Sequence, residues 1–112
     1  MFSNIELIKH ITDEIEFVLI NTKDKNFEQV FDDTILSRAI IRSLEIVGEA
    51  SKKLHPDFKS QNPQIDWKAI AGTRDKLIHD YFGVDYDIVW DIIKNELPEL
   101  KFELEKIIER NS

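Results

Sequence analysis

Apolar side chains recur every three or four residues along this sequence, and this helical spacing restricts the fold more than any other feature. No five-residue stretch keeps the alternation of polar and apolar residues that a half-buried strand needs. The pattern predicts an all-α fold, an up-and-down bundle of four to five helices. A chain of 112 residues has the length of one domain, so we expect one bundle over residues 1–112.

Capping residues divide the pattern into helices. Ser3 and Glu6 have the spacing of a capping box at the start of the first helix. Asp33 is placed to cap a long helix that ends near residue 54, and residues 55–63 read as the main loop. The other expected helices begin at Asp66, Asp85 and Pro98, and a short helical patch covers residues 27–31. The core face predicted for the long helix carries Ile35, Leu36, Ala39, Ile40, Ile46, Val47, Ala50 and Leu54.

Composition excludes several classes of protein. The chain has no cysteine, which excludes disulfide scaffolds, thiol catalysis and cysteine-bound metal. Its longest aliphatic and aromatic run, residues 17–20, is far short of the ~20 residues of a membrane span. No basic segment followed by an apolar one begins the sequence, so we expect a cytoplasmic protein.

The distribution of charge is more informative than the net charge of −7. Residues 34–80 hold 6 acidic and 8 basic residues, whereas residues 1–33 hold 8 acidic and 3 basic ones. Residues 81–112 hold 8 acidic and 4 basic residues, so the middle of the chain is its only basic part. A polyanion such as RNA is therefore expected to bind there.

Arg74 is the anomaly of the predicted helix 66–81. On a helical wheel it falls near the middle of an apolar stripe, and a guanidinium on such a face is costly unless it is paired. It either forms a structural ion pair with Glu45 or Glu49, or it marks a cleft or a partner interface. The stripe consists of Trp67, Ile70, Leu77, Ile78 and Tyr81.

His79 is the second chemical group of this helix. It lies about 140° from Arg74 on a straight helix, so one chain cannot direct both side chains at one atom. Asp75 stands four residues before His79 and can orient or charge the imidazole. Alone, such an Asp–His pair is more often ordinary surface than a site.

Residues 74–81 also form the pattern Arg-x4-His-x-Tyr, which ends at Tyr81. Over about residues 35–100 the sequence resembles the HepT toxins of HEPN/MNT toxin–antitoxin modules. The flanking matches are Ile46-Val47-Gly48-Glu49-Ala50, Asp66-Trp67, Ile70-Ala71-Gly72, Val89-Trp90 and Leu97-Pro98.

The resemblance implies a metal-independent ribonuclease that acts as a homodimer and needs no cofactor. Arg74 and His79 would be the catalytic residues, with Asp75 and Glu49 as possible supporting groups. Tyr81 would receive AMP from a cognate nucleotidyltransferase antitoxin that neutralises the toxin. The chemistry is coherent, because RNA carries its own nucleophile, the 2′-hydroxyl, and arginine can hold the phosphate while histidine transfers the proton.

Two further interpretations remain open at this stage. In the first, the motif belongs to a non-catalytic helical module that docks a nucleotidyltransferase or binds a nucleotide, and the net charge of −7 favours this interpretation. In the second interpretation, the protein is a dimeric bundle in which Arg74 has only a structural role, as half of a buried ion pair. A two-fold axis near the motif helix would place two copies of His79 and Arg74 in one cleft. Arg38, Arg42, Glu45 and Glu49 gather on one side of the long helix, as a solvated or dimer-facing stripe.

Overall fold

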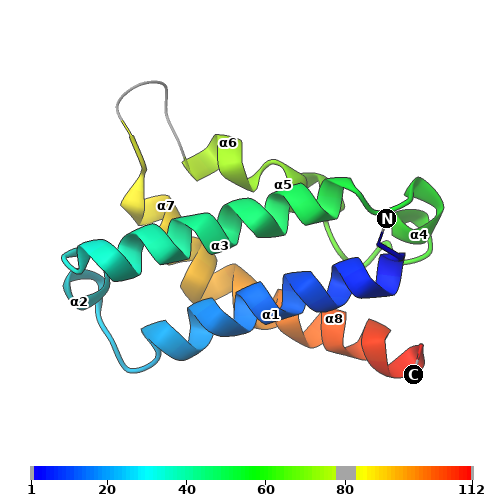
Figure 1. Cartoon of the computed structure of the whole chain (residues 1–112), viewed down its shortest axis with the longest axis horizontal. Coiled ribbons are helices and arrows are strands. Elements are labelled where there is room, and N and C mark those ends of the chain that lie inside the picture. The colour runs from blue at the N-terminus through cyan, green and yellow to red at the C-terminus, as the bar shows by residue number, and fades with distance from the viewer. Residues whose placement is uncertain (1, 78–82, 112) are drawn as a thin grey trace.

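The computed structural model describes residues 2–77 and 83–111, apart from the side chain of Arg74, and every regular element in these ranges is helical. The all-α prediction is therefore confirmed (Figure 1). In chain order the elements are α1 (Asn4–Thr22), α2 (Phe27–Phe31), α3 (Thr34–Lys52), α4 (Pro56–Ser60), α5 (Trp67–Ala71), α6 (Thr73–Leu77), α7 (Tyr86–Asp91), η1 (Ile92–Glu96) and α8 (Leu97–Arg110).

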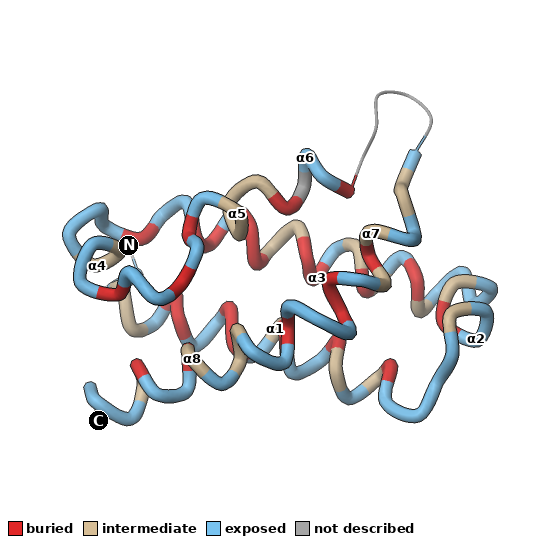
Figure 2. Tube along the Cα trace, turned by 180° about the vertical axis from the view of Figure 1, so that it is seen from behind, coloured by how far each residue is buried: buried red, intermediate tan, exposed pale blue. Residues whose placement is uncertain are grey.

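Three long helices, α1, α3 and α8, form the framework. Each is amphipathic, and their apolar stripes face one another, as the burial pattern along the trace shows (Figure 2). The α5–α6 segment packs against α3 on the flank opposite α1 (Figure 1). The largest fully buried side chains are Ile8, Ile11, Ile15, Ile40, Leu44, Leu77, Ile93, Leu104, Ile107, Val18, Val30 and Val89.

The predicted helix caps are present. The Glu6 N–H donates to Ser3 Oγ over 3.1 Å, and the Leu36 N–H donates to Asp33 Oδ1 over 3.0 Å. Asp66 and Asp85 cap α5 and α7 in the same way. The short patch at residues 27–31 is α2, with its own capping box. These bonds satisfy amide donors that the first turn of a helix leaves unpaired, and so fix where each helix begins.

The two C-terminal helices predicted at Asp85 and Pro98 are joined without a loop, which corrects the expected break. Pro98 has no N–H to donate to the carbonyl four residues back, so the α-helical ladder cannot pass through it unchanged. The chain accommodates the proline with the π-helical turn η1, in which the Leu97 N–H donates to the carbonyl of Ile92.

Two other expectations need correction. The predicted loop 55–63 contains the short helix α4, which begins because His55 Nδ1 accepts the Asp57 N–H over 3.0 Å and Pro56 suits the first turn. The helix predicted over residues 66–81 is interrupted at Gly72, which ends α5 before α6 begins. The wheel that spans both halves therefore does not describe one straight helix.

Ile35 was predicted in the core face of α3, but 84% of its surface is exposed. It lies in the first turn of α3, on the side opposite the buried stripe. Ile40, Val47 and Ala50 are buried as predicted, whereas Ala39 and Ile46 are only half-buried, at the edge of that stripe. Within the described part of the chain, no helix is long and apolar enough to cross a membrane.

Candidate functional site

The sequence motif begins on α6. The backbone of Arg74 lies within this helix, but its side chain, like His79 and Tyr81, falls outside what the structure describes. The predicted ion pair of Arg74 and the predicted catalytic pair therefore remain predictions. The structure does describe the elements that hold the two ends of the motif segment.

The α5–α6 segment is fixed by a few buried side chains. Trp67 is buried at the start of α5, and its indole N–H donates to the carbonyl of Asn62 over 3.0 Å. In α6, Thr73 and Leu77 are buried. Trp67 is thus a structural anchor with its polar atom satisfied, as its apolar spacing predicted, and it is not available to stack on a base.

Gly48 sets the distance between α3 and this segment. A Cβ atom at position 48 would come within 3.3 Å of the Ile70 carbonyl oxygen and 3.6 Å of the Ala71 carbonyl oxygen. The backbone at the end of α5 therefore rests directly on α3, a close approach that glycine allows because it has no Cβ atom. The motif helix α6 follows immediately from this contact.

The far end of the motif segment is tied back to its start. The Asp85 N–H donates to the Leu77 carbonyl over 2.8 Å. This bond joins the last residue of α6 to the residue that precedes α7. Asp85 also caps α7 by accepting the N–H groups of Asp87 and Ile88. Gly83, with φ of +93°, adopts the left-handed conformation that favours glycine.

The proposed supporting residues lie on different elements. Asp75 is exposed on α6, and Glu49 is exposed on the outer side of α3. Lys68 on α5 and Lys76 on α6 are also exposed, so basic groups flank the start of the motif. The structure places these four residues on three elements, α3, α5 and α6, around the start of the motif.

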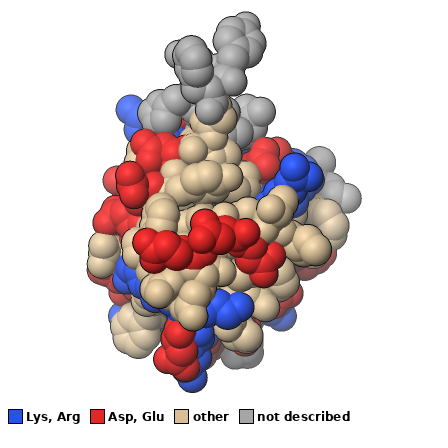
Figure 3. Space-filling view, turned by 90° about the vertical axis from the view of Figure 1, so that its left-hand side faces the viewer, with Lys and Arg blue, Asp and Glu red and all other residues tan. Residues whose placement is uncertain are grey.

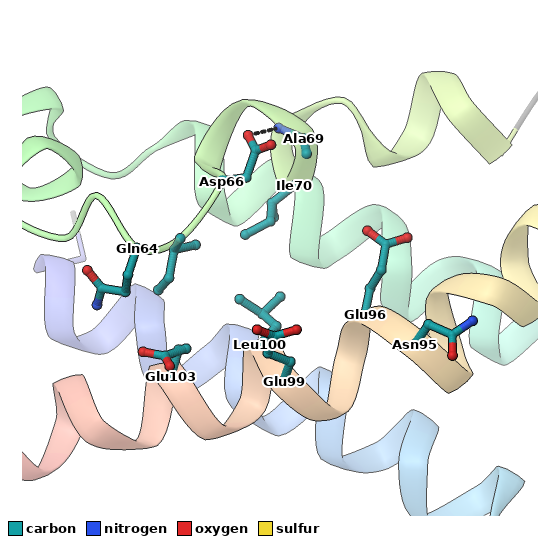
Figure 4. Close-up of a pocket in the computed structure, with 10 residues that line it drawn as sticks. Gln64, Asp66, Ala69, Ile70, Asn95, Glu96, Glu99, Leu100 and Glu103 are labelled. Carbon is teal, nitrogen blue, oxygen red and sulfur yellow. Dashed lines mark hydrogen bonds between the residues drawn. The ribbon is translucent and has the colours of Figure 1, made fainter.

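Sequence reasoning missed a groove next to α5. Its cavity of about 250 Å³ lies between α5 and the η1–α8 helix, with Ile70 and Leu100 pointing into it from the two sides (Figure 4). Its rim carries the carboxylates of Asp66, Glu96, Glu99 and Glu103, and among the described residues no Lys or Arg lines it. A groove of this charge repels phosphate, so RNA does not fit here. The sequence signal was the helical spacing of positions 96, 99 and 103.

Acidic side chains also dominate the end of the molecule formed by α2 and α7, where a band of them crosses the surface (Figure 3). Trp90 is half-buried there, edge-to-face with Phe27 and Phe31 and with Lys94 Nζ 4.6 Å from its ring centroid. These contacts engage its ring, so a structural role fits Trp90 better than base stacking. Among the described residues, no group of three or more His, Asp or Glu could hold a metal ion.

Comparison with known proteins identifies a consistent group of relatives. The family described as "Ribonuclease HepT-like" matches residues 2–107. A "Putative RNase" from Caldanaerobacter subterraneus subsp. tengcongensis is 46% identical over 103 residues, which cover 92% of each chain. A "Probable ribonuclease HepT" from Thermococcus cleftensis is 42% identical over 105 residues, covering 94% of this chain and 96% of the relative.

The same match recurs inside a longer protein. A "Gamma-glutamylcyclotransferase and putative RNase" from Methanocaldococcus jannaschii is 42% identical over 102 residues, which are 91% of this chain but 46% of that one. The matched unit thus occurs both as most of a protein and as part of one. No solved structure matches the chain significantly.

Proposed function

Because this chain belongs to the HepT-like ribonuclease family, we propose that it is an endoribonuclease that acts as the toxin of a toxin–antitoxin module. The observation that carries this proposal is the Arg74-x4-His79-x-Tyr81 pattern within a match that covers residues 2–107. The short, anchored α5–α6 segment supports it, because this segment holds the start of the pattern at the surface beside exposed Lys68 and Lys76.

The proposed reaction needs no metal ion. The 2′-hydroxyl of a ribose attacks the adjacent phosphorus, the bond from phosphorus to the 5′-oxygen breaks, and a 2′,3′-cyclic phosphate and a 5′-hydroxyl result. One imidazole accepts the proton of the 2′-hydroxyl, and a protonated imidazole donates a proton to the leaving oxygen. Arg74 stabilises the charge that builds on the phosphate oxygens. His79 is the only histidine in the motif, so two copies of it are required.

We therefore propose a homodimer in which each chain supplies one His79 and one Arg74 to a shared cleft. Asp75, four residues before His79, would orient the imidazole of its own chain. Glu49, exposed on α3, would position Arg74. Sharing removes the need for one chain to direct both catalytic side chains at the same phosphate.

Control of the toxin is proposed to act at Tyr81. A nucleotidyltransferase antitoxin transfers AMP from ATP to the phenolic oxygen, with release of pyrophosphate. The attached phosphate would occupy Arg74 as a substrate phosphate does, and the purine would block RNA entry. Co-expression with the adjacent nucleotidyltransferase should add the mass of one or more AMP units to the wild type and none to Tyr81→Phe. An unmodified Tyr81 in a fully neutralised toxin would contradict this mechanism.

The alternative function is a non-catalytic helical module that docks a nucleotidyltransferase. One observation favours it: the groove between α5 and the η1–α8 helix carries four carboxylates, and no Lys or Arg is among the described residues that line it, so this part of the surface is not suited to RNA. In this case the neighbouring gene would still encode a nucleotidyltransferase, but the chain alone would leave RNA intact.

The deciding experiment is RNA cleavage by the purified chain without its partner. We expect cleavage that survives EDTA and falls by about 10²–10⁴-fold in His79→Ala, with an unchanged circular dichroism spectrum. His10→Ala is the matched control, because His10 is an exposed histidine on α1 and should leave cleavage intact. Equal activity in wild type and His79→Ala, or loss of activity with EDTA, would contradict the proposed function.

A further inference from the structure

The loop between α4 and α5, residues 61–66, is bonded to the C-terminal end of α8. Arg110, in the last turn of α8, donates from Nη2 to Asn62 Oδ1 over 3.0 Å. The two residues are 48 positions apart in the sequence, and their elements meet at one end of the molecule (Figure 2). The bond therefore joins a framework helix to the residues that lead into the α5–α6 segment.

Asn62 connects three elements at this point. It is only 6% exposed. Its side-chain N–H donates to the Phe58 carbonyl of α4 over 2.9 Å, while its own carbonyl accepts the Trp67 indole N–H of α5 over 3.0 Å. An amide bonded through both its oxygen and its nitrogen is held in one orientation. We call this group of residues the Asn62 junction; it consists of Phe58, Asn62, Trp67 and Arg110.

The α5–α6 segment depends on such attachments because its own helices are short. Helices α5 and α6 have five residues each, and helices of this length are not stable alone. Close contact at Gly48 supports the segment on the side of α3. On the other side, the acidic groove of about 250 Å³ lies between α5 and the η1–α8 helix. The Asn62 junction attaches the start of α5 to α8 beside this open space.

We propose that Arg110 and Asn62 are positioning residues for the catalytic motif, which rests on the proposed ribonuclease function. Arg110 acts through the Asn62 side chain, and Asn62 in turn holds Trp67, the first residue of α5. Trp67 stands seven residues before Arg74, whose backbone lies in α6. A shift of α5 would carry this backbone with it, and catalytic groups displaced by ~1 Å lose rate steeply.

A direct contact with RNA is the alternative role for Arg110, because this arginine is exposed and cationic. The two roles differ in their kinetics. Loss of a phosphate contact that is equally strong in the ground state and the transition state raises KM and leaves kcat unchanged. Misplacement of catalytic groups lowers kcat instead. Asn62 separates the roles again, because its buried side chain is not available to RNA.

Steady-state RNA cleavage by the full chain tests the proposal. Arg110→Ala and Asn62→Ala should each lower kcat by about three- to tenfold, with KM within about twofold of the wild-type value. The double variant should lose no more than the more affected single variant, because the two side chains act through one bond. Higher KM with unchanged kcat in Arg110→Ala, or losses that multiply in the double variant, would overturn the proposal.

The second link of the Asn62 junction is tested by Trp67→Phe. This change keeps an aromatic ring at the start of α5 but removes the indole N–H that the Asn62 carbonyl accepts. We expect kcat to fall by about three- to tenfold here as well. A wild-type kcat in Trp67→Phe would overturn the route from Arg110 to the motif through Trp67.

Two controls exclude general effects of charge and stability. Lys106→Ala also removes a positive charge from the last turns of α8, but Lys106 pairs with Glu103 of its own helix over 3.4 Å. It should keep the wild-type kcat and KM. Ile15→Ala opens a cavity on α1, away from the α5–α6 segment, and should keep kcat while it lowers the unfolding temperature. An equal fall of kcat in either control would contradict a specific role of the Asn62 junction.

Hydrogen exchange of the backbone amides separates this inference from the proposed function, because it needs no RNA. In Arg110→Ala and Asn62→Ala, the amides of residues 67–77 should exchange faster, while the slowest amides of α1 and α3 change less. If the wild type leaves RNA intact, the ribonuclease proposal fails and the positioning of a catalytic motif fails with it. Faster exchange confined to residues 67–77 would then still support the attachment itself. Unchanged exchange and unchanged kcat in a chain that cleaves RNA would support the ribonuclease and overturn the positioning role.

Discussion

The long helices α1, α3 and α8 and the short segment α5–α6 are stabilised in different ways. The framework helices have 19, 19 and 14 residues, each with a continuous buried stripe. Helices α5 and α6 have five residues each and depend on buried Trp67, Thr73 and Leu77. Five-residue helices are not stable alone, so tertiary anchors hold the segment in place. The motif therefore begins on a part of the chain that cannot form its structure independently.

This contrast predicts that stability and RNA cleavage depend on different residues. Of the variants considered, Arg74→Ala should show the largest difference between its effects on the two quantities. The change should lower RNA cleavage by about 10²–10⁴-fold while the free energy of unfolding changes by less than ~1 kcal/mol. Cleavage assays and urea unfolding measure the two quantities. A loss of ~3–5 kcal/mol in stability would instead identify Arg74 as half of a buried ion pair.

Ile15→Ala should produce the opposite result. Ile15 is fully buried on α1, away from the motif, and its truncation leaves a cavity that costs ~2–5 kcal/mol of unfolding free energy. The protein that remains folded should cleave RNA at the wild-type rate. Ile20→Ala is the matched control, since Ile20 lies on the same helix and is 65% exposed, so its stability should change by less than ~0.5 kcal/mol. Equal losses for both isoleucines would contradict the assigned core.

Gly48→Ala probes the contact between the framework and the motif segment. The added Cβ would sit 3.3 Å from the Ile70 carbonyl oxygen, so the end of α5 must move by a few tenths of an ångström. The gain of ~1 kcal/mol in helix propensity offsets part of this strain, so stability should change by less than ~1 kcal/mol. Displaced catalytic groups lose rate steeply, and we expect cleavage to fall by about three- to tenfold. Full activity would show that the motif does not depend on this contact.

The same contrast explains what the sequence could predict. Helix caps and apolar spacing are local signals, and they predicted α1, α2, α3 and the starts of α5 and α7. The sequence does not predict the π-helical turn before Pro98. A helix can accommodate a proline either by ending before it or by widening one turn, and the sequence pattern is the same in both cases. Ile35 was misplaced because a wheel alone does not show where a buried stripe ends. The motif residues could be predicted from the family pattern. The acidic groove could not, because it forms only when Asp66 and Glu99, from distant parts of the chain, are brought together.

Two equivalent caps give the smallest and most specific test of the comparison. The Leu36 N–H donates to Asp33 Oδ1 and the Ala69 N–H donates to Asp66 Oδ1, both over 3.0 Å. Removing either bond with alanine costs about 1 kcal/mol locally. Asp33→Ala should lower the global free energy of unfolding by that amount, because α3 unfolds together with the framework. Asp66→Ala should lower global stability less, because α5 can open while the framework stays folded.

Hydrogen exchange of the backbone amides distinguishes the two outcomes. In Asp66→Ala we expect faster exchange confined to residues 67–77, together with a modest loss of RNA cleavage, since the start of the motif is held less firmly. In Asp33→Ala the slowest-exchanging amides of α1, α3 and α8 should all accelerate by a similar factor of about five, the equivalent of ~1 kcal/mol. If both variants accelerate exchange uniformly, α5–α6 unfolds with the framework as one cooperative unit, and the distinction between the two regions does not hold.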